Sequence, residues 1–498
     1  MQLQFRKSLL QCLEQGIQEV KNTELTQEIR LGEGMPDVGR ILGTWSQCLL
    51  RSKQWQGDEI EVSGGVKTWT LYLPEEGSEP RVVEGWLPFQ QRWNSSSPGK
   101  TGTICVQPLI RYADGRSITA RKIMLRIGLG MLCRTYLPMA AEIYEPEELP
   151  ADLALLRQTY PMRLPVEAGE KTFSLDEEVA FPLAGTDWKI LTGMLHPEVT
   201  EQRVLNEKVM FKGKGNLQLL CRNSDGDIQP AYLELPFAQL AQLEGDWGDS
   251  CNAEVSVEVT DLETDLLESG QLRIKCSLVG QYLVDQERSI TVAEDAYCPN
   301  RQVRLECTNL QLPAVLEDRL ETISLEQTMT GQSGQVICCA FLPDHPKQRQ
   351  GTDAVHLELS GQMQVLFYGT DGSLQGGTAH WENNRDIPAS DNCRMFAQVC
   401  PLGQMQAMSN AEQIGASCKL QLTSRSYCMT EIPMIAEITY SDLEEPRVNS
   451  PSLILRRTGR RSLWEIAKEC GSTVEAIRQA NRLDGDPTGD RMLLIPVL

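Results

Sequence analysis

Residues 208–237, KVMFKGKGNLQLLCRNSDGDIQPAYLELPF, have the composition and spacing of a β-hairpin. Apolar side chains alternate with polar ones before Gly213, and a second strand-like run covers residues 215–221. Asp225-Gly226 follows, and Asp-Gly between apolar runs is typical of a two-residue hairpin turn whose two positions need positive φ. The segment closes with Pro236-Phe237. We therefore predict two antiparallel strands joined by a tight turn.

The same pattern occurs twice more, as EIEVSGGVKTWTLYLPEEGSEPRVVEGWLPF (59–89) and HLELSGQMQVLFYGTDGSLQGGTAHWENNRDIP (356–388). The central glycines are spaced by 149 and 148 residues. These glycines are Gly64, Gly213 and Gly361. An apolar pair precedes each one: Ile41-Leu42, Ile190-Leu191 and Val336-Ile337. An acidic-Gly turn and then a proline follow each one: Glu76-Gly77 and Pro88-Phe89, Asp225-Gly226 and Pro236-Phe237, Asp371-Gly372 and Pro388. This internal similarity predicts three diverged copies of one β domain.

We expect a mainly β chain in which three tandem β-sandwich-like repeats form a linear array, at 24–150, 165–300 and 305–446. Residues 1–23 are predicted to form an N-terminal amphipathic helix, because apolar side chains recur there at helical spacing: Leu9, Leu10, Leu13, Ile17 and Val20. A linker at 447–452, within a proline- and acid-rich stretch, is expected to precede a separate domain at 453–498.

The end of the chain follows a different pattern, seen in RRSLWEIAKECGSTVEAIRQAN (460–481). Ser462 with Glu465 predicts a helix that starts with a capping box, and Gly471 predicts its end. Ser472 with Glu475 predicts a second capped helix, which Asn481 can stop. Strand-like runs at 453–457 and 492–496 flank the pair. The predicted order is strand, helix, helix, strand.

This order, with Leu463-Trp464-x-Ile466-Ala467, Gly471, Thr473-Val474-x-x-Ile477, Ala480-Asn481 and Leu493-Leu494-Ile495-Pro496, resembles the LysM module. The resemblance implies a βααβ domain that binds N-acetylglucosamine glycans between the loop before its first helix and the loop after its second. The residues it places there as ligand- or partner-binding are Gly459, Arg460, Arg461, Ser462, Leu463, Trp464, Asn481, Arg482 and Leu483.

The sequence departs from the LysM pattern at one point of that groove. Arg460-Arg461-Ser462 stands where family members usually have Gly-Asp-Thr or Gly-Asp-Ser. The two arginines make the groove more cationic, which leaves room for an acidic protein partner in place of a glycan. Residues 456–498 have a net charge of +2 in a chain whose total is −21.

Repeats of this kind before a LysM module resemble the SPOCS family of sporulation proteins, in the arrangement of SipL-type spore coat morphogenetic proteins. The likeness rests on the blocks around Gly64 and Gly213, on GEGMPDVGRILGTW (32–45) and on the C-terminal module. It implies a non-enzymatic assembly scaffold that gathers at the forespore surface in the mother-cell cytoplasm and contacts a coat-basement ATPase of the SpoIVA type. The alternative is a peptidoglycan-binding protein of the cell wall or spore cortex.

Composition and motifs bound the remaining function classes. The charge of −21 disfavours nonspecific nucleic-acid binding, and no apolar run is long enough to predict a membrane span. The N-terminus has no apolar signal core, and sixteen scattered cysteines without a CxxC pair favour reduced thiols in a cytosol. The four histidines lack partners at metal-ligand spacing: His196, His345, His356 and His380. We therefore expect no catalytic residues, no metal site and no cofactor.

Overall fold

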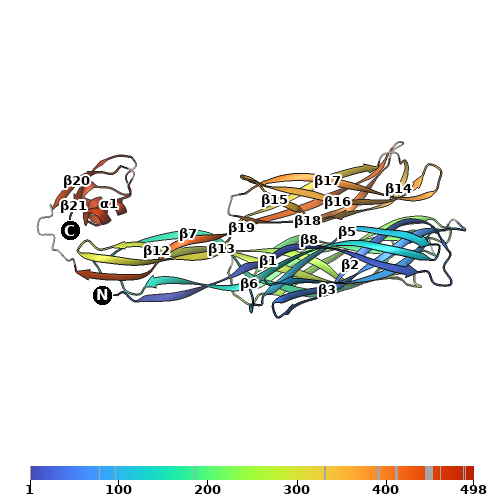
Figure 1. The fold of residues 1–498 in the computed structure, drawn as a ribbon, viewed down its shortest axis with the longest axis horizontal. Helices are drawn as coiled ribbons and strands as arrows, with labels where there is room; N and C mark the ends of the chain where they lie inside the picture. The colour runs from blue at the N-terminus through green and yellow to red at the C-terminus, as the bar shows by residue number, and fades with distance from the viewer. Residues whose placement is uncertain are drawn as a thin grey trace.

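The computed structural model describes residues 2–497 except 78, 96, 186, 249, 330–331, 390–392, 410–412, 443–451, 460, 486 and 488. The chain is mainly β, as expected, and forms a broad head, a narrower stalk and a small C-terminal module beside the far end of the stalk (Figure 1). The predicted linker at 447–452 lies almost entirely outside the described residues.

Three bodies of the same topology make up the head and stalk, and each consists of two sheets around its own apolar core. In the first body one sheet has the order β1-β6-β5 and the other β2-β3-β4. The strands are β1 (Phe5–Arg30), β2 (Val38–Gln56), β3 (Glu59–Pro74), β4 (Arg81–Asn94), β5 (Thr103–Thr119) and β6 (Lys122–Pro146).

The second and third bodies repeat this plan. The second contains β7 (Ala154–Ala180), β8 (Lys189–Leu205), β9 (Lys208–Arg222), β10 (Ile228–Gln242), β11 (Cys251–Leu266) and β12 (Gln271–Tyr297). The third contains β13 (Arg301–Met329), β14 (Gly334–Pro343), β15 (Lys347–Gln350), β16 (Ala354–Gly369), β17 (Leu374–Pro388), β18 (Arg394–Ser409) and β19 (Ile414–Asp442). Here β14 and β15 both pair with β16 and together replace a single strand such as β2.

The bodies do not form the linear array that the repeat predicts. They lie side by side, and strands from all three enclose one apolar cluster in the head. The same β-bulge occurs in β2, β8 and β14, where pairing skips one residue, and these three residues belong to the cluster or pack against it: Leu42, Leu191 and Ile337. Shared burial of apolar surface favours this compact arrangement over a string of separate units.

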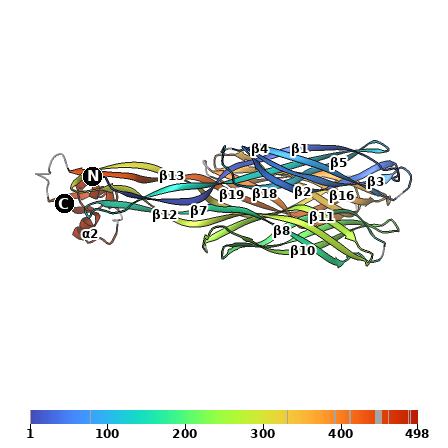
Figure 2. The same cartoon turned by 90° about the horizontal axis from the view of Figure 1, so that it is seen from below.

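The stalk consists of three long two-stranded ribbons, one from each body, which run side by side away from the head (Figure 2). They bury side chains against one another: Cys12, Ala141, Leu164, Ile290, Val292, Leu310, Leu312, Ile432 and Met434. The predicted N-terminal helix is therefore wrong, because residues 5–30 form β1 and pair with β6 along almost their full length. Leu9, placed on the apolar face of that helix, is 65 % exposed. The bodies consequently begin at β1, β7 and β13, earlier than the predicted boundaries.

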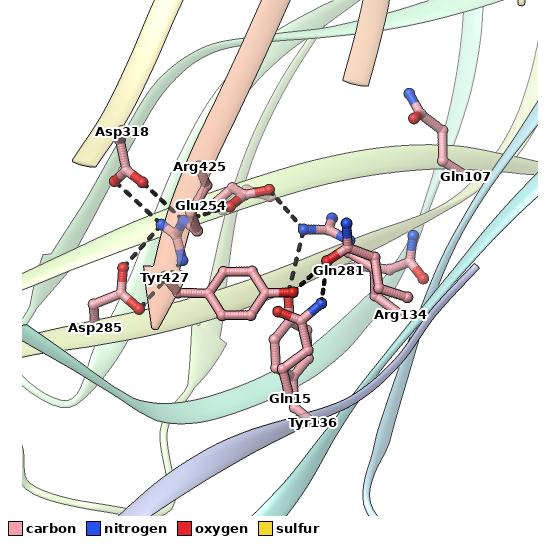
Figure 3. A network of polar contacts seen from close by, with 12 residues as sticks. Gln15, Gln107, Arg134, Tyr136, Glu254, Gln281, Asp285, Asp318, Arg425 and Tyr427 are labelled. Atoms are coloured by element: carbon pink, nitrogen blue, oxygen red, sulfur yellow. Dashed lines mark hydrogen bonds and ion pairs between the residues drawn. The ribbon is translucent and has the colours of Figure 1, made fainter. Parts of the chain in front are cut away.

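Charged side chains, three of them buried (Arg134, Asp285 and Arg425), join the three bodies at the neck, where each ribbon leaves its sandwich (Figure 3). We call this set the neck cluster; it comprises Arg134 of the first body, Arg163, Glu254 and Asp285 of the second, and Asp318 and Arg425 of the third. Arg425 contacts Glu254 at 3.4 Å, Asp285 at 2.8 Å and Asp318 at 2.9 Å, and Arg134 contacts Glu254 at 3.1 Å. Three positive groups thus face three negative ones across the body interfaces.

Candidate functional site

The C-terminal module contains β20 (Leu453–Arg457), α1 (Leu463–Cys470), α2 (Val474–Asn481) and β21 (Met492–Pro496), in the predicted order. The two strands pair antiparallel. Both helices pack on one face of this small sheet and enclose a core of Leu463, Ile466, Ala467, Cys470, Ile477, Leu493 and Ile495.

Local capping accounts for the start and end of α1. The Ser462 hydroxyl accepts the Glu465 N–H, and the Glu465 carboxylate accepts the Ser462 N–H at 2.8 Å, so the predicted capping box is confirmed. Gly471, with φ of 65°, takes the left-handed conformation that ends the helix, also as predicted.

The caps of α2 each lie one residue later than predicted. Thr473, not Ser472, is the N-cap, and its hydroxyl accepts the Ala476 N–H at 3.1 Å. Asn481 is the last helical residue, and Arg482, with φ of 51°, is the left-handed cap. Either of two adjacent hydroxyl residues can cap a helix, so the sequence alone does not distinguish Ser472 from Thr473.

Asn481 fastens α2 to β21. Its side-chain nitrogen donates to the Leu494 carbonyl at 2.6 Å and to the Ile477 carbonyl at 2.8 Å, and its oxygen accepts the Leu494 N–H at 2.8 Å. The side chain that the LysM resemblance places in the groove therefore serves an internal contact in this structure. Leu463 is fully buried, and Leu483 packs against the same core.

The rim before α1 carries an excess of positive charge. Arg461 and Arg456 both contact one carboxylate oxygen of Glu469, each at 2.6 Å, so a single negative group faces two guanidinium groups. Gly459 has φ of 58° and donates its N–H to Asp490 at 3.0 Å. Arg460 lies outside the described residues.

Trp464 turns away from the predicted groove and faces the tip of the stalk. Its indole N–H donates to Asp295 of β12 at 2.8 Å, and its ring meets Tyr297 edge-on with centroids 4.8 Å apart. Lys468, one turn later on α1, donates to both carboxylate oxygens of Asp295, at 2.7 and 2.9 Å. The helix face of the module is therefore docked on the second ribbon.

This docking contact is absent from the sequence predictions. Asp295 and Tyr297 lie some 170 residues before α1, and no local pattern links a strand end to a helix at that distance. The only available signal is that Trp464 and Lys468 stand four residues apart, which places them on one face of a helix.

A cavity of about 130 Å³ lies in the head where the three bodies meet. Its lining includes Cys48 and Gln107 of the first body, Glu258 of the second and Cys400 of the third. Burial raises the pKa of Glu258 to about 8, although Lys53 and Arg134 act in the opposite direction. Within the described residues, no three His, Cys, Asp or Glu side chains come together in a way that could hold a metal ion.

Comparison with known proteins adds no relative: no family model, curated protein or solved structure matches this chain. Among the described residues, neither α1 nor α2 is long and apolar enough to cross a membrane. Any functional assignment consequently depends on the geometry of the chain itself.

Proposed function

We propose that the chain is a non-enzymatic assembly scaffold of endospore formation, which recruits spore coat proteins to the forespore surface through its LysM-like module. The partner we propose is a coat-basement ATPase of the SpoIVA type, met in the mother-cell cytoplasm. The main support is the position of the module: a small capped βααβ unit with a cationic rim is presented beside the end of a long stalk, away from the head.

The arrangement suits presentation of one contact at a distance. The ribbons and the head share buried apolar clusters and the neck cluster, so the three bodies support one another as a single elongated unit. A scaffold of this form separates the surface that meets one partner from the surfaces available to others. The head then offers the outer faces of three related bodies for further contacts, and repeated weak contacts gain strength from avidity.

A fluorescent fusion of the full chain, followed through sporulation, tests the cellular role. We expect a ring around the forespore. Diffuse signal or uniform labelling of the wall contradicts the proposal.

Charge reversal at the rim tests the partner contact. We expect Arg460→Glu with Arg461→Glu to weaken capture of a SpoIVA-type ATPase by about 2 kcal/mol, the order of energy carried by close charge pairs at interfaces. The matched control is Arg6→Glu with Arg349→Glu on the stalk and head, where both side chains are strongly exposed. Equal capture by the rim variant and the control contradicts a cationic contact at this place.

The alternative function, binding of peptidoglycan in wall or cortex, is favoured by the strand–helix–helix–strand order of the module. Titration of the full chain with chitin oligomers or muropeptides distinguishes the two. Saturable shifts of the amides at 459, 461–463 and 481–483 favour the glycan, whereas their absence together with ATPase capture favours the scaffold.

A further inference from the structure

The outer face of the sheet formed by β20 and β21 is apolar and open. Leu455 stands opposite Leu494 and Arg457 opposite Met492, so their side chains lie on the same face, together with Leu453. The exposed fractions are 53 % for Leu453, 65 % for Leu455, 51 % for Met492 and 36 % for Leu494. Docking of the module on the stalk uses its helices and leaves this face uncovered by any described segment.

One edge of the same sheet also has no strand beside it among the residues that the structure describes. Val497 donates to the Ser452 carbonyl at 3.1 Å and Thr458 donates to the Arg491 carbonyl at 2.9 Å. Because antiparallel hydrogen bonding alternates along a strand, the N–H and C=O groups of Leu453, Leu455 and Arg457 point away from β21. No described residue pairs with these backbone groups.

The two edges of the sheet differ in whether their outward backbone groups are hydrogen-bonded. On β21, Leu494 directs both backbone groups away from β20, and the Asn481 side chain bonds to both. β20 has no corresponding side chain among the described residues. An unpaired strand edge is a template for another strand, so an edge left open beside an apolar face points to an added strand.

Charge and area indicate what that strand contains. The Arg457 side chain is 74 % exposed on the apolar face, and the carboxylate it pairs with, Asp490, is 3.7 Å away. A second copy paired through β20 about a two-fold axis at Leu455 would set each Arg457 beside Leu453 of the other copy and supply no carboxylate. The face comes from two strands of five residues each, too few to bury the roughly 800 Å² per partner of a stable interface between proteins.

We propose that β20 binds an extended segment of a partner protein as an added antiparallel strand, with apolar side chains beside Leu453 and Leu455 and a carboxylate facing Arg457. The inference rests on the proposed function, because it adds a second surface of the module, beside the cationic rim, on which the partner is held. Backbone hydrogen bonds supply affinity in such strand addition, and alternate side chains supply selectivity.

The test uses the full chain and a fluorescent seven-residue peptide, Thr-Glu-Thr-Val-Thr-Val-Thr, whose glutamate and valines face Arg457, Leu455 and Leu453 in an antiparallel strand. We expect saturable binding by fluorescence anisotropy and slower hydrogen exchange at the amides of Leu453, Leu455 and Arg457. A peptide with lysine in place of glutamate, and one N-methylated at the amides that face β20, should both fail to bind. Equal binding of the N-methylated peptide overturns strand addition.

Matched variants test whether Leu455 and Arg457 make the contact with the peptide. Leu455→Gln should weaken peptide binding about tenfold, whereas Leu320→Gln, at a side chain 68 % exposed on β13, should not. Arg457→Glu should abolish the preference for glutamate over lysine, and Arg349→Glu, whose side chain is 75 % exposed, should retain it. Thermal unfolding verifies that all four variants stay folded. Absence of peptide binding, or binding insensitive to Leu455 and Arg457, overturns the inference.

The outcome is separable from that of the proposed function. A forespore ring that persists in Leu455→Gln, together with no peptide binding, rejects the strand-addition surface and retains the scaffold. Peptide binding by β20 without a forespore ring rejects the scaffold and retains the surface.

Discussion

At the residue scale, the repeated glycines allow an aromatic ring to pack closely against the middle strand of a sheet. Gly64 pairs with Phe89, Gly213 with Phe237 and Gly361 with Trp381. A Cβ atom added at these glycines would stand 2.7, 2.6 and 2.6 Å from the respective rings. It would also overlap a backbone carbonyl of the other neighbouring strand, at Leu49, Glu198 and Leu342 respectively. The glycine is therefore required by close packing on two sides.

The pairing of β16 with β17 shows that Pro388 does not occupy the same position in the third body as Pro88 and Pro236 do in the first two. Pro88 and Pro236 precede the ring residue, but Pro388 pairs with Ala354 at the far end of β16 and β17. The position equivalent to Phe89 is Trp381, and no proline precedes it.

The turns differ from the prediction too, because Gly77, Gly226 and Gly372 have positive φ whereas Asp225 and Asp371 do not. These connections are longer than two residues, so only the glycine needs the left-handed conformation.

We predict that Gly213→Ala lowers the free energy of unfolding by about 1–3 kcal/mol, the usual cost of overpacking a filled core. The control is Gly32→Ala, at a glycine with open space around the added Cβ and no positive φ. Denaturant unfolding monitored by tryptophan fluorescence compares the two. A Gly213→Ala protein as stable as the Gly32→Ala protein would show that the neighbouring strand moves aside without cost.

At the element scale, predictions succeeded where the signal is local. Ser462 and Gly471 directly flank the helix that they delimit, so α1 could be placed from sequence. The strand β1 could not, because its apolar residues also fit a helical period and its partner, β6, lies about a hundred residues away. Tertiary pairing overrides a weak local preference in such a segment. The docking of α1 on β12 was missed for the same reason.

That docking contact leads to a prediction about the module. Asp295→Lys should release the module from the stalk, because it removes the acceptor of Trp464 and sets two ammonium groups against each other at Lys468. We expect hydrogen exchange in α1 and at the end of β12 to rise by roughly tenfold, equivalent to about 1.4 kcal/mol. Asp225→Lys, on an exposed turn of the head, is the control. Unchanged exchange in the Asp295→Lys protein would show that apolar contact with Tyr297 suffices to hold the module.

At the scale of the whole molecule, the neck cluster makes the three copies complementary instead of identical. Arg134-Thr135-Tyr136 and Arg425-Ser426-Tyr427 occupy corresponding places where β6 and β19 leave the head. The second body has no arginine there and supplies Glu254 and Asp285 to face the other two. An arginine at that place in the second body would raise the neck cluster to four arginines against the three carboxylates of Glu254, Asp285 and Asp318. The different charges of the second copy thus let the three bodies associate. The spacing of the repeats in the sequence does not predict this association.

We predict that Arg425→Met destabilises the folded chain by about 3–5 kcal/mol, the range observed when one member of a buried ionic set is removed. Asp285, with no exposed side chain, would lose its contact at 2.8 Å and keep Arg163, and Glu254 would keep Arg134. Arg319→Met is the control, because Arg319 pairs with Glu317 on the surface. If both variants unfold at the same denaturant concentration, the neck cluster does not stabilise the assembly of the bodies.

The cavity between the bodies makes a pH dependence testable. Burial raises the pKa of Glu258 to about 8 from an ordinary value of 4.5, so the folded chain keeps a proton that the unfolded chain releases. Between these two values the folded state binds more protons, and linkage requires stability to fall as pH rises. The contribution of the neutral carboxyl group is fully present below about 4.5 and is lost as pH rises through about 8. The charged groups that act on Glu258 are Lys53 and Arg134, and both oppose the shift.

Glu258→Gln should therefore flatten the decline in thermal stability between pH 5 and pH 8.5 and leave the protein more stable than wild type at the upper end. The amide retains the shape and neutrality of the protonated carboxyl group, so the two proteins should have similar stability near pH 5. Glu326→Gln, at an exposed position on β13, controls for the loss of one carboxylate from a chain of net charge −21. Because other groups titrate in the same window, the informative quantity is the difference between each variant and wild type at each pH. Parallel profiles for wild type and Glu258→Gln would mean that Glu258 reaches solvent and ionises in the folded chain, and that the junction of the three bodies is hydrated.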